Sequence, residues 1–220
     1  MTDALPSPLS MLHALPLFPL GAVLFPGGSL PLRIFEVRYL DMVGRCHKAG
    51  TPFGVVSLTQ GSEVRVAGAT TESFATVGTL ARIREFAAPQ AGLLEIECLG
   101  TQRFSVQHSS QLKHGLWTAD VALLPDDVAV EVPPDLAHAA QALRRLIDTL
   151  EQQRDLQDQG EMRLPITLPY RYDDCGWLAN RWCELLPLTS EVKQRLMMLD
   201  SPLMRLELVS DLLAQHGIAG

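Results

Sequence analysis

Hydrophobic and polar positions follow two different periods in the two parts of this chain. In residues 93–99, LLEIECL, apolar side chains alternate with glutamates. A period of two is typical of a strand with one buried face. From residue 135 onward the apolar side chains recur every three or four positions, which is typical of a helix with one buried face. The sequence therefore predicts an α+β protein, with strands first and helices second.

The strand-like part contains several short apolar segments separated by turn residues. Strands are predicted at 53–58, 74–86, 93–99, 104–106 and 116–124, and residues 87–92 are predicted to form a hairpin connection between the second and the third. Several short strands accompanied by one helix indicate a small barrel or a folded-over sheet.

The chain opens with an apolar stretch, LPLFPLGAVLFPGGSLPLRIFEVRYL, at residues 15–40. Its four prolines exclude a continuous helix, because proline lacks a backbone N–H and clashes with the preceding turn. The stretch therefore predicts short extended segments, followed by a helix from about Phe35 to Ala49. Arg33, Glu36 and Arg38 are expected to form ion pairs and hydrogen bonds that fix this helix to the strands.

The second half is predicted to be helical. One apolar face predicts a helix over about 135–159; its members are Leu136, Ala140, Leu143, Ile147 and Leu150. Three more helices are expected: one after Asp173-Asp174, one capped by Thr189 or Ser190, and one that begins at Ser201-Pro202 and ends before Gly217. The acidic, proline-terminated segment 126–134 has no period and is interpreted as a linker.

Five segments resemble one known family in the expected order. They are LPLFPLGAVLFPGGSLPLRIFEVRY at 15–39, VGTLARI at 77–83, GTQRF at 100–104, LPLTSEVKQRL at 186–196 and RLEL at 205–208. Together they resemble the N-terminal, substrate-binding domain of the ATP-dependent Lon proteases over residues 13 to 214. The resemblance implies an N-terminal PUA-like β-barrel with one helix at 1–125, the linker at 126–134, and a C-terminal α-helical bundle at 135–220. The ATPase and protease domains of the full proteases are not in this sequence, so a stand-alone domain is expected.

Composition and charge narrow the function classes. The chain is 47% hydrophobic and 20% charged, as in ordinary globular proteins. Residues 1–125 are neutral, and residues 126–220 carry nine basic and sixteen acidic side chains, which account for the whole net charge of −7. Nucleic-acid binding is not expected, because it requires a basic surface. The N-terminus lacks a basic signal-peptide start, and six prolines in residues 4–32 exclude a membrane span there, so the cytoplasm is expected.

The residue types needed for catalysis do not occur in the required patterns. The chain has no Gly-Lys dipeptide of a phosphate-binding loop, no GxSxG and no HExxH. Its four cysteines are widely spaced and its six histidines show no pairing at helical spacing, so we expect free thiols, no metal site and no cofactor. The prediction is a protein that is not an enzyme.

One segment is predicted to form a binding surface. Residues 169–182, PYRYDDCGWLANRW, contain Tyr170, Tyr172, Trp177 and Trp182, four of the six tyrosines and tryptophans in the chain. Such side chains are frequent in protein-binding hot spots. We hypothesise that they line a groove between the barrel and the bundle. In the alternative, the tryptophans pack the bundle and the tyrosines cover the domain junction.

The resemblance implies a non-catalytic module that binds polypeptide clients or a protease machine, acting as an adaptor. PUA-like barrels also bind RNA or small ligands, so a ligand or RNA sensor is the alternative, and a hydrolase of unrecognised type is the least supported. The sequence does not predict the client or the oligomeric state.

Overall fold

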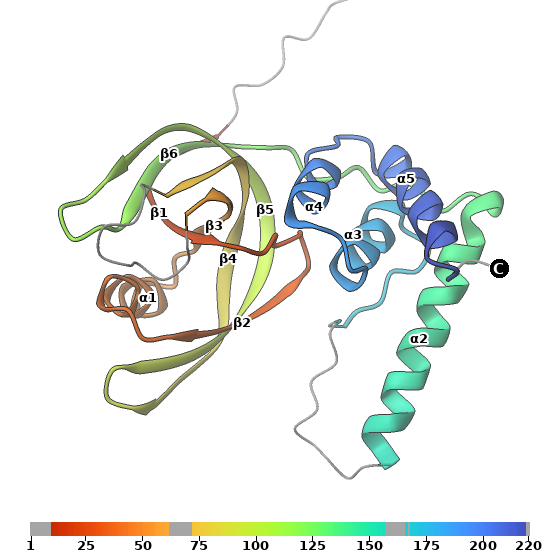
Figure 1. The fold of residues 1–220 in the computed structure, drawn as a ribbon, viewed down its shortest axis with the longest axis horizontal. Coiled ribbons are helices and arrows are strands. Elements are labelled where there is room, and N and C mark those ends of the chain that lie inside the picture. Colours follow the sequence, from red (N-terminus) through yellow and green to blue (C-terminus); the bar gives the residue numbers. More distant parts are fainter. Residues whose placement is uncertain (1–9, 62–71, 157–165, 167, 219–220) are drawn as a thin grey trace, which may run out of the picture. The chain divides into compact units, whose positions relative to one another are not determined.

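The computed structural model describes residues 10–61, 72–156, 166 and 168–218. These residues form a mixed α+β fold with one six-stranded sheet and five α-helices (Figure 1). The chain divides into two compact units. The first consists of residues up to Leu24 and Pro31–Asp126, and the second of Phe25–Leu30 and the chain from Asp127 onward.

The strands of the sheet close on themselves. The strands are β1 (Met11–Leu20), β2 (Ser29–Ile34), β3 (Phe53–Gln60), β4 (Ser73–Gln90), β5 (Leu93–Gln111) and β6 (Trp117–Leu123). Their order is β2-β5-β4-β3-β1-β6, and a further pairing of β5 with β6 completes a ring of five strands, with β2 added at β5. Strands β1 and β3 pair in parallel. The pairs β1–β6, β3–β4, β4–β5 and β5–β6 are antiparallel.

The prediction of separate strands at 93–99 and 104–106 is wrong, because both belong to the 19-residue strand β5. Gly100 does not lie in a turn; it pairs with Ala81 of β4. Register shifts in the β4–β5 pairing mark irregularities of the kind that bend and twist strands. The long strand can therefore pair with β4 along most of its length and with β6 from Phe104 onward.

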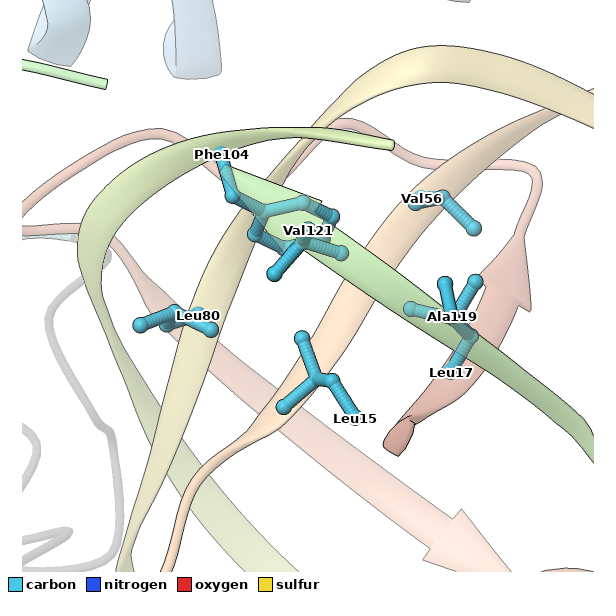
Figure 2. Close-up of a cluster of buried hydrophobic side chains, with 7 residues drawn as sticks. All are labelled: Leu15, Leu17, Val56, Leu80, Phe104, Ala119 and Val121. Atoms are coloured by element: carbon cyan, nitrogen blue, oxygen red, sulfur yellow. The ribbon is translucent and has the colours of Figure 1, made fainter. Parts of the chain in front are cut away.

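The ring encloses an apolar core (Figure 2). Seven buried side chains from β1, β3, β4, β5 and β6 point toward one another: Leu15, Leu17, Val56, Leu80, Phe104, Ala119 and Val121. Gly78 of β4 lies against this core, and a Cβ there would clash with the Val55 carbonyl and the Phe104 ring. The VGT segment therefore needs glycine for close packing.

The predicted first helix is confirmed as α1 (Val37–Ala49), and it begins two residues later than expected. Glu36 is its N-cap, with extended backbone, and Gly50 ends it with a φ of 66°. The ring of Tyr39 stacks on Phe18 of β1 at 4.0 Å between centroids. This stacking fixes the first turn of α1 on the sheet.

The four helices predicted for the second half are present, and the predicted end of the first, at about 159, lies outside the described residues. After a short 3-10 helix, η1 (Pro134–Leu136), they are α2 (Ala137–Leu156), α3 (Cys175–Leu185), α4 (Ser190–Met197) and α5 (Pro202–Gln215). Asp174, Thr189 and Ser201 are the N-caps, and each side chain accepts a hydrogen bond from the backbone N–H three residues later. Within the described chain, no helix is long and apolar enough to cross a membrane.

Two segments outside these helices also belong to the second unit. In the segment expected to be a linker, the carbonyl of Val130 accepts from the N–H of Cys175 at 2.8 Å, and the N–H of Val132 donates to Asp173 at 3.0 Å. In the loop Phe25–Leu30, the carbonyls of Pro26 and Gly27 accept hydrogen bonds from Arg181 of α3. This part of the opening signature is therefore held by the helical unit, although the sequence had placed it with the strands.

Candidate functional site

The loop before α3 and the first turn of α3 carry three aromatic side chains. Tyr170 and Tyr172 lie in the loop, and Trp177 lies in the first turn of the helix. The carboxylate of Asp174 accepts from the N–H of Trp177 at 2.8 Å, so the cap of the helix also fixes the position of this tryptophan. Two tyrosines and a tryptophan are thereby presented from one short segment.

The three rings form one cluster. The centroids of Tyr170 and Tyr172 are 5.6 Å apart, those of Tyr172 and Trp177 are 5.6 Å apart, and those of Tyr170 and Trp177 are 6.3 Å apart. These distances and tilted geometries are favourable for aromatic pairs. Trp177 is 9% exposed and both tyrosines are partly buried. Leu168, two positions before Tyr170 in the chain, is 74% exposed. We call Leu168, Tyr170, Tyr172 and Trp177 the aromatic patch.

Helix α2 contributes charged side chains to the aromatic patch. The guanidinium carbon of Arg144 lies 4.6 Å from the centre of the Tyr172 ring. The hydroxyl of Tyr170 donates to Glu151 Oε1 at 2.8 Å. Burial raises the pKa of Tyr172, and the negative charge of Asp148 raises it further. The hydroxyl of Tyr172 therefore stays protonated at neutral pH, although the positive charge of Arg144 acts in the opposite direction.

Trp182, the fourth predicted site residue, lies elsewhere. Its side chain is 2% exposed, and its indole N–H donates to the carbonyl of Ala139 in α2 at 3.1 Å. Among the described residues no ring contact joins it to the aromatic patch. Trp182 therefore packs α3 on α2, as in the alternative interpretation of this segment.

Glu36 and Arg38, which follow β2, have structural roles, as expected. Arg38 is buried and donates to Glu36 Oε2 at 3.1 Å, to Glu72 Oε1 at 3.2 Å and to the carbonyl of Gly115 at 2.9 Å. Glu72 in turn accepts from the indole N–H of Trp117 at 2.9 Å. These bonds tie α1 to the sheet, which confirms the predicted role of Glu36 and Arg38. Arg33 is exposed and pairs with Glu95 of β5 at 3.1 Å.

The sequence had not predicted a small pocket in the first unit. Its volume is about 90 Å³, and it is lined by β1, β2 and the start of α1 through Phe18, Leu20, Leu32, Arg33, Ile34, Phe35, Glu36 and Tyr39. Phe35 at its wall is 58% exposed, and the neighbouring Val37 is 74% exposed. The signal was present in the sequence, because an apolar pair on both sides of Glu36 does not fit the buried face of α1. Large exposed apolar side chains beside a hollow are typical of ligand sites.

Side chains that could hold a metal or act as nucleophiles are not gathered in the described parts of the chain. No group of three or more His, Cys, Asp or Glu side chains there could hold a metal ion. The four cysteines are free and buried. Burial raises the pKa of Cys98 and of Cys183 to about 12, so neither forms the reactive thiolate at neutral pH.

Comparison with known proteins identifies the family. The sequence profile of the ATP-dependent protease La (LON) substrate-binding domain matches residues 14–215. A Lon N-terminal domain protein from Xanthomonas campestris is similar in structure with a TM-score of 0.68 and 32% sequence identity, over 92% of this chain and 98% of that chain. The N-terminal domain of the Lon protease of the Mycobacterium avium complex has a TM-score of 0.55 and 16% identity, over 92% and 99% of the two chains, and shows the fold alone. The comparison with curated proteins found no match.

The fold is thus that of Lon N-terminal domains. The chain belongs to the LON substrate-binding domain family, as the opening signature indicated. The matched family is one of binding domains, and the match includes neither an ATPase nor a protease domain.

Proposed function

We propose that this protein is a non-catalytic module that binds unfolded or specific polypeptide clients through the aromatic patch, and that it works as an adaptor for a protease machine. The observation that carries the proposal is the family match over residues 14–215. We also propose that the first unit is a PUA-like barrel, that the second is a helical bundle, and that the protein acts in the bacterial cytoplasm.

The aromatic patch supports this function by its chemistry. Tyrosine and tryptophan bury a large apolar area at a low cost in conformational entropy and keep a polar edge for hydrogen bonds. Leu168 adds an exposed apolar side chain beside them. An apolar client segment can lose water against this patch, whereas ordering the unfolded client opposes binding. The expected dissociation constant is therefore roughly micromolar or weaker.

The pocket in the first unit favours a second candidate, a small-ligand sensor. The pocket has an apolar wall, and Arg33 and Glu36 are among its lining residues. This composition is that of a small-molecule site. An RNA sensor receives no such support, because the excess of charge in the second half is negative.

Two matched variants separate these candidates. Tyr172→Ala removes a ring from the aromatic patch and Phe35→Ala removes a ring from the pocket. Binding of an unfolded client, an RNA pool and a metabolite panel is measured by calorimetry and tryptophan fluorescence. We expect client binding by the wild type and by Phe35→Ala, and a loss of about fivefold or more for Tyr172→Ala. Client binding that survives Tyr172→Ala and disappears in Phe35→Ala would assign recognition to the pocket. Absence of client binding by the wild type would refute the proposed function.

The same preparations test the predicted lack of catalysis. The purified chain is expected to hydrolyse neither ATP nor peptides, with or without magnesium. A turnover that disappears when a single residue of this chain is changed would contradict that prediction.

A further inference from the structure

One face of α2 lies along the tyrosines of the aromatic patch. Arg144, Asp148 and Glu151 are four and three positions apart, so they lie on the same side of the helix. Arg144 stacks on the ring of Tyr172, and Glu151 accepts from the hydroxyl of Tyr170. Asp148 lies between them along the helix and contributes to the raised pKa of Tyr172. We call Asp148 and Glu151 the acidic rim of the aromatic patch.

The contact between Arg144 and Tyr172 is a cation–π interaction, which shows that the tyrosine ring can bind a positive charge. A guanidinium group is attracted to the face of an aromatic ring by the ring quadrupole. Here the guanidinium carbon lies 4.6 Å from the ring centre. Tyr172 is partly exposed, so a cation from a partner can approach the part of the ring that Arg144 leaves open, on the side of Asp148 and Glu151.

The carboxylates of the acidic rim form no ion pair among the described residues. The described carboxylates that pair with arginine within the second unit are Asp127, Asp174, Glu184 and Glu191. Neither Asp148 nor Glu151 has a basic partner in the described part of the chain. Asp148 is exposed, and the partner of Glu151 among the described residues is the neutral hydroxyl of Tyr170. The rim lies in the half of the chain that has sixteen acidic and nine basic residues.

We propose that the aromatic patch and its acidic rim select segments of unfolded polypeptide in which Lys or Arg side chains neighbour apolar ones. This inference rests on the proposed function and specifies its client class. The apolar side chains of such a segment lose water against Leu168 and the tyrosine rings, while its cations approach Asp148 and Glu151. Charge complementarity of this kind selects the partner and increases the rate of association.

The test compares three unfolded peptides of equal length that share the same Leu and Phe residues. Their remaining positions are Lys and Arg in the first, Gln in the second and Glu in the third. We expect the basic peptide to bind about three- to tenfold more tightly than the neutral one, and the acidic peptide to bind most weakly. The advantage of the basic peptide should shrink at high salt, because screening weakens interactions between exposed charges.

Matched variants locate the charge selection. The double variant Asp148→Asn with Glu151→Gln removes the acidic rim and keeps an oxygen that can accept from the hydroxyl of Tyr170. The double variant Glu207→Gln with Asp211→Asn removes the same charge from exposed positions of α5. We expect the first variant to bind the basic and neutral peptides equally and the second to bind like the wild type. If the first double variant is unstable, the single variant Asp148→Asn replaces it in the peptide-binding comparison, because Asp148 is at an exposed position.

The outcomes distinguish the inference from the function on which it rests. If none of the three peptides binds, the proposed function fails. If the neutral or acidic peptide binds as tightly as the basic one, polypeptide recognition stands and the proposed selection is wrong. Equal loss of basic-peptide binding in both double variants would show a general effect of net charge and would also overturn the inference.

Discussion

Arg205 of α5 forms a two-pronged ion pair with Asp127, the residue at which the second unit resumes after the strands. Nη1 lies 2.6 Å from Asp127 Oδ2, and Nη2 lies 3.1 Å from Oδ1. Arg205 is 1% exposed, and it also donates to Asn180 Oδ1 at 3.0 Å and to the carbonyls of Leu196 and Leu199. All five guanidinium N–H groups therefore have acceptors, which burial of this charge requires.

The first prediction concerns this ion pair. Asp127→Ala is expected to destabilise the second unit by about 3 kcal/mol, because it leaves a buried guanidinium without its charge partner. Urea unfolding followed by the helical circular dichroism signal measures the loss. Glu191→Ala is the control: the ion pair of Glu191 with Arg195 is largely exposed on both sides, so its removal should cost less than about 1 kcal/mol. Equal losses in the two variants would mean that Asp127 does not stabilise the fold in this way.

The second prediction uses one substitution at two glycines. Gly78→Ala is expected to destabilise the first unit by roughly 1–3 kcal/mol, because its Cβ would clash with the backbone of β3 and with Phe104. Gly44→Ala in α1 meets no atom within 4 Å and should stabilise by roughly 0.5–1 kcal/mol, because alanine is the better helix former. The free energy of unfolding of each variant is the measurement. A Gly78→Ala variant as stable as the wild type would contradict the close packing of β4.

The third prediction is a pH dependence at Glu184, near the end of α3. Burial raises the pKa of Glu184 to about 7, against opposing effects of Arg181 and Lys193. The folded state therefore holds a proton that the unfolded state releases near the ordinary glutamate pKa of 4.5. This group stabilises the fold fully below about pH 4.5, and its contribution falls as the pH rises to about 7, by at most about 3 kcal/mol.

Glu184→Gln isolates this effect, because glutamine keeps the size of the side chain and does not titrate. The difference in unfolding free energy between wild type and variant should favour the wild type more at pH 5 than at pH 8. A difference that is constant over this range would show that Glu184 ionises normally. Because the carboxylate packs against Gly28 and pairs with Arg181, hydrogen exchange of residues 25–30 should follow the same pH dependence in the wild type.

Local signals in the sequence predicted local structure well. The three helix starts could be predicted from the N-cap residues Asp174, Thr189 and Ser201. An N-cap depends only on a short side chain that accepts a hydrogen bond from the backbone N–H three residues later. The continuity of β5 and the position of the loop Phe25–Leu30 depend on partners far away in the chain. The carbonyl of Gly27 is bonded to Arg181, 154 positions later, and no local pattern encodes that contact.

The candidate site was predicted in part. Tyr170, Tyr172 and Trp177 lie together, as their closeness in the sequence suggested. Trp182 could have been separated from them by helix geometry, because five positions correspond to a rotation of about 140° around the axis. The contribution of α2 could not be predicted, since it depends on how α2 packs against the loop before α3. The hollow beside Phe35 likewise depends on packing, although the apolar pair on both sides of Glu36 could be recognised in the sequence.

The last prediction separates Trp182 from Tyr172 by their contributions to stability. Trp182→Ala removes a ring that is 2% exposed and hydrogen bonded to Ala139, and it should cost about 3–5 kcal/mol. Tyr172→Ala removes a partly exposed ring with contacts to Trp177 and Arg144, and it should cost roughly 1 kcal/mol. Thermal and urea unfolding of both variants gives the two values. A Tyr172→Ala variant as unstable as Trp182→Ala would place Tyr172 in the core. The client-binding surface would then have to be sought at exposed apolar side chains whose replacement leaves stability unchanged, such as Phe35 and Leu168.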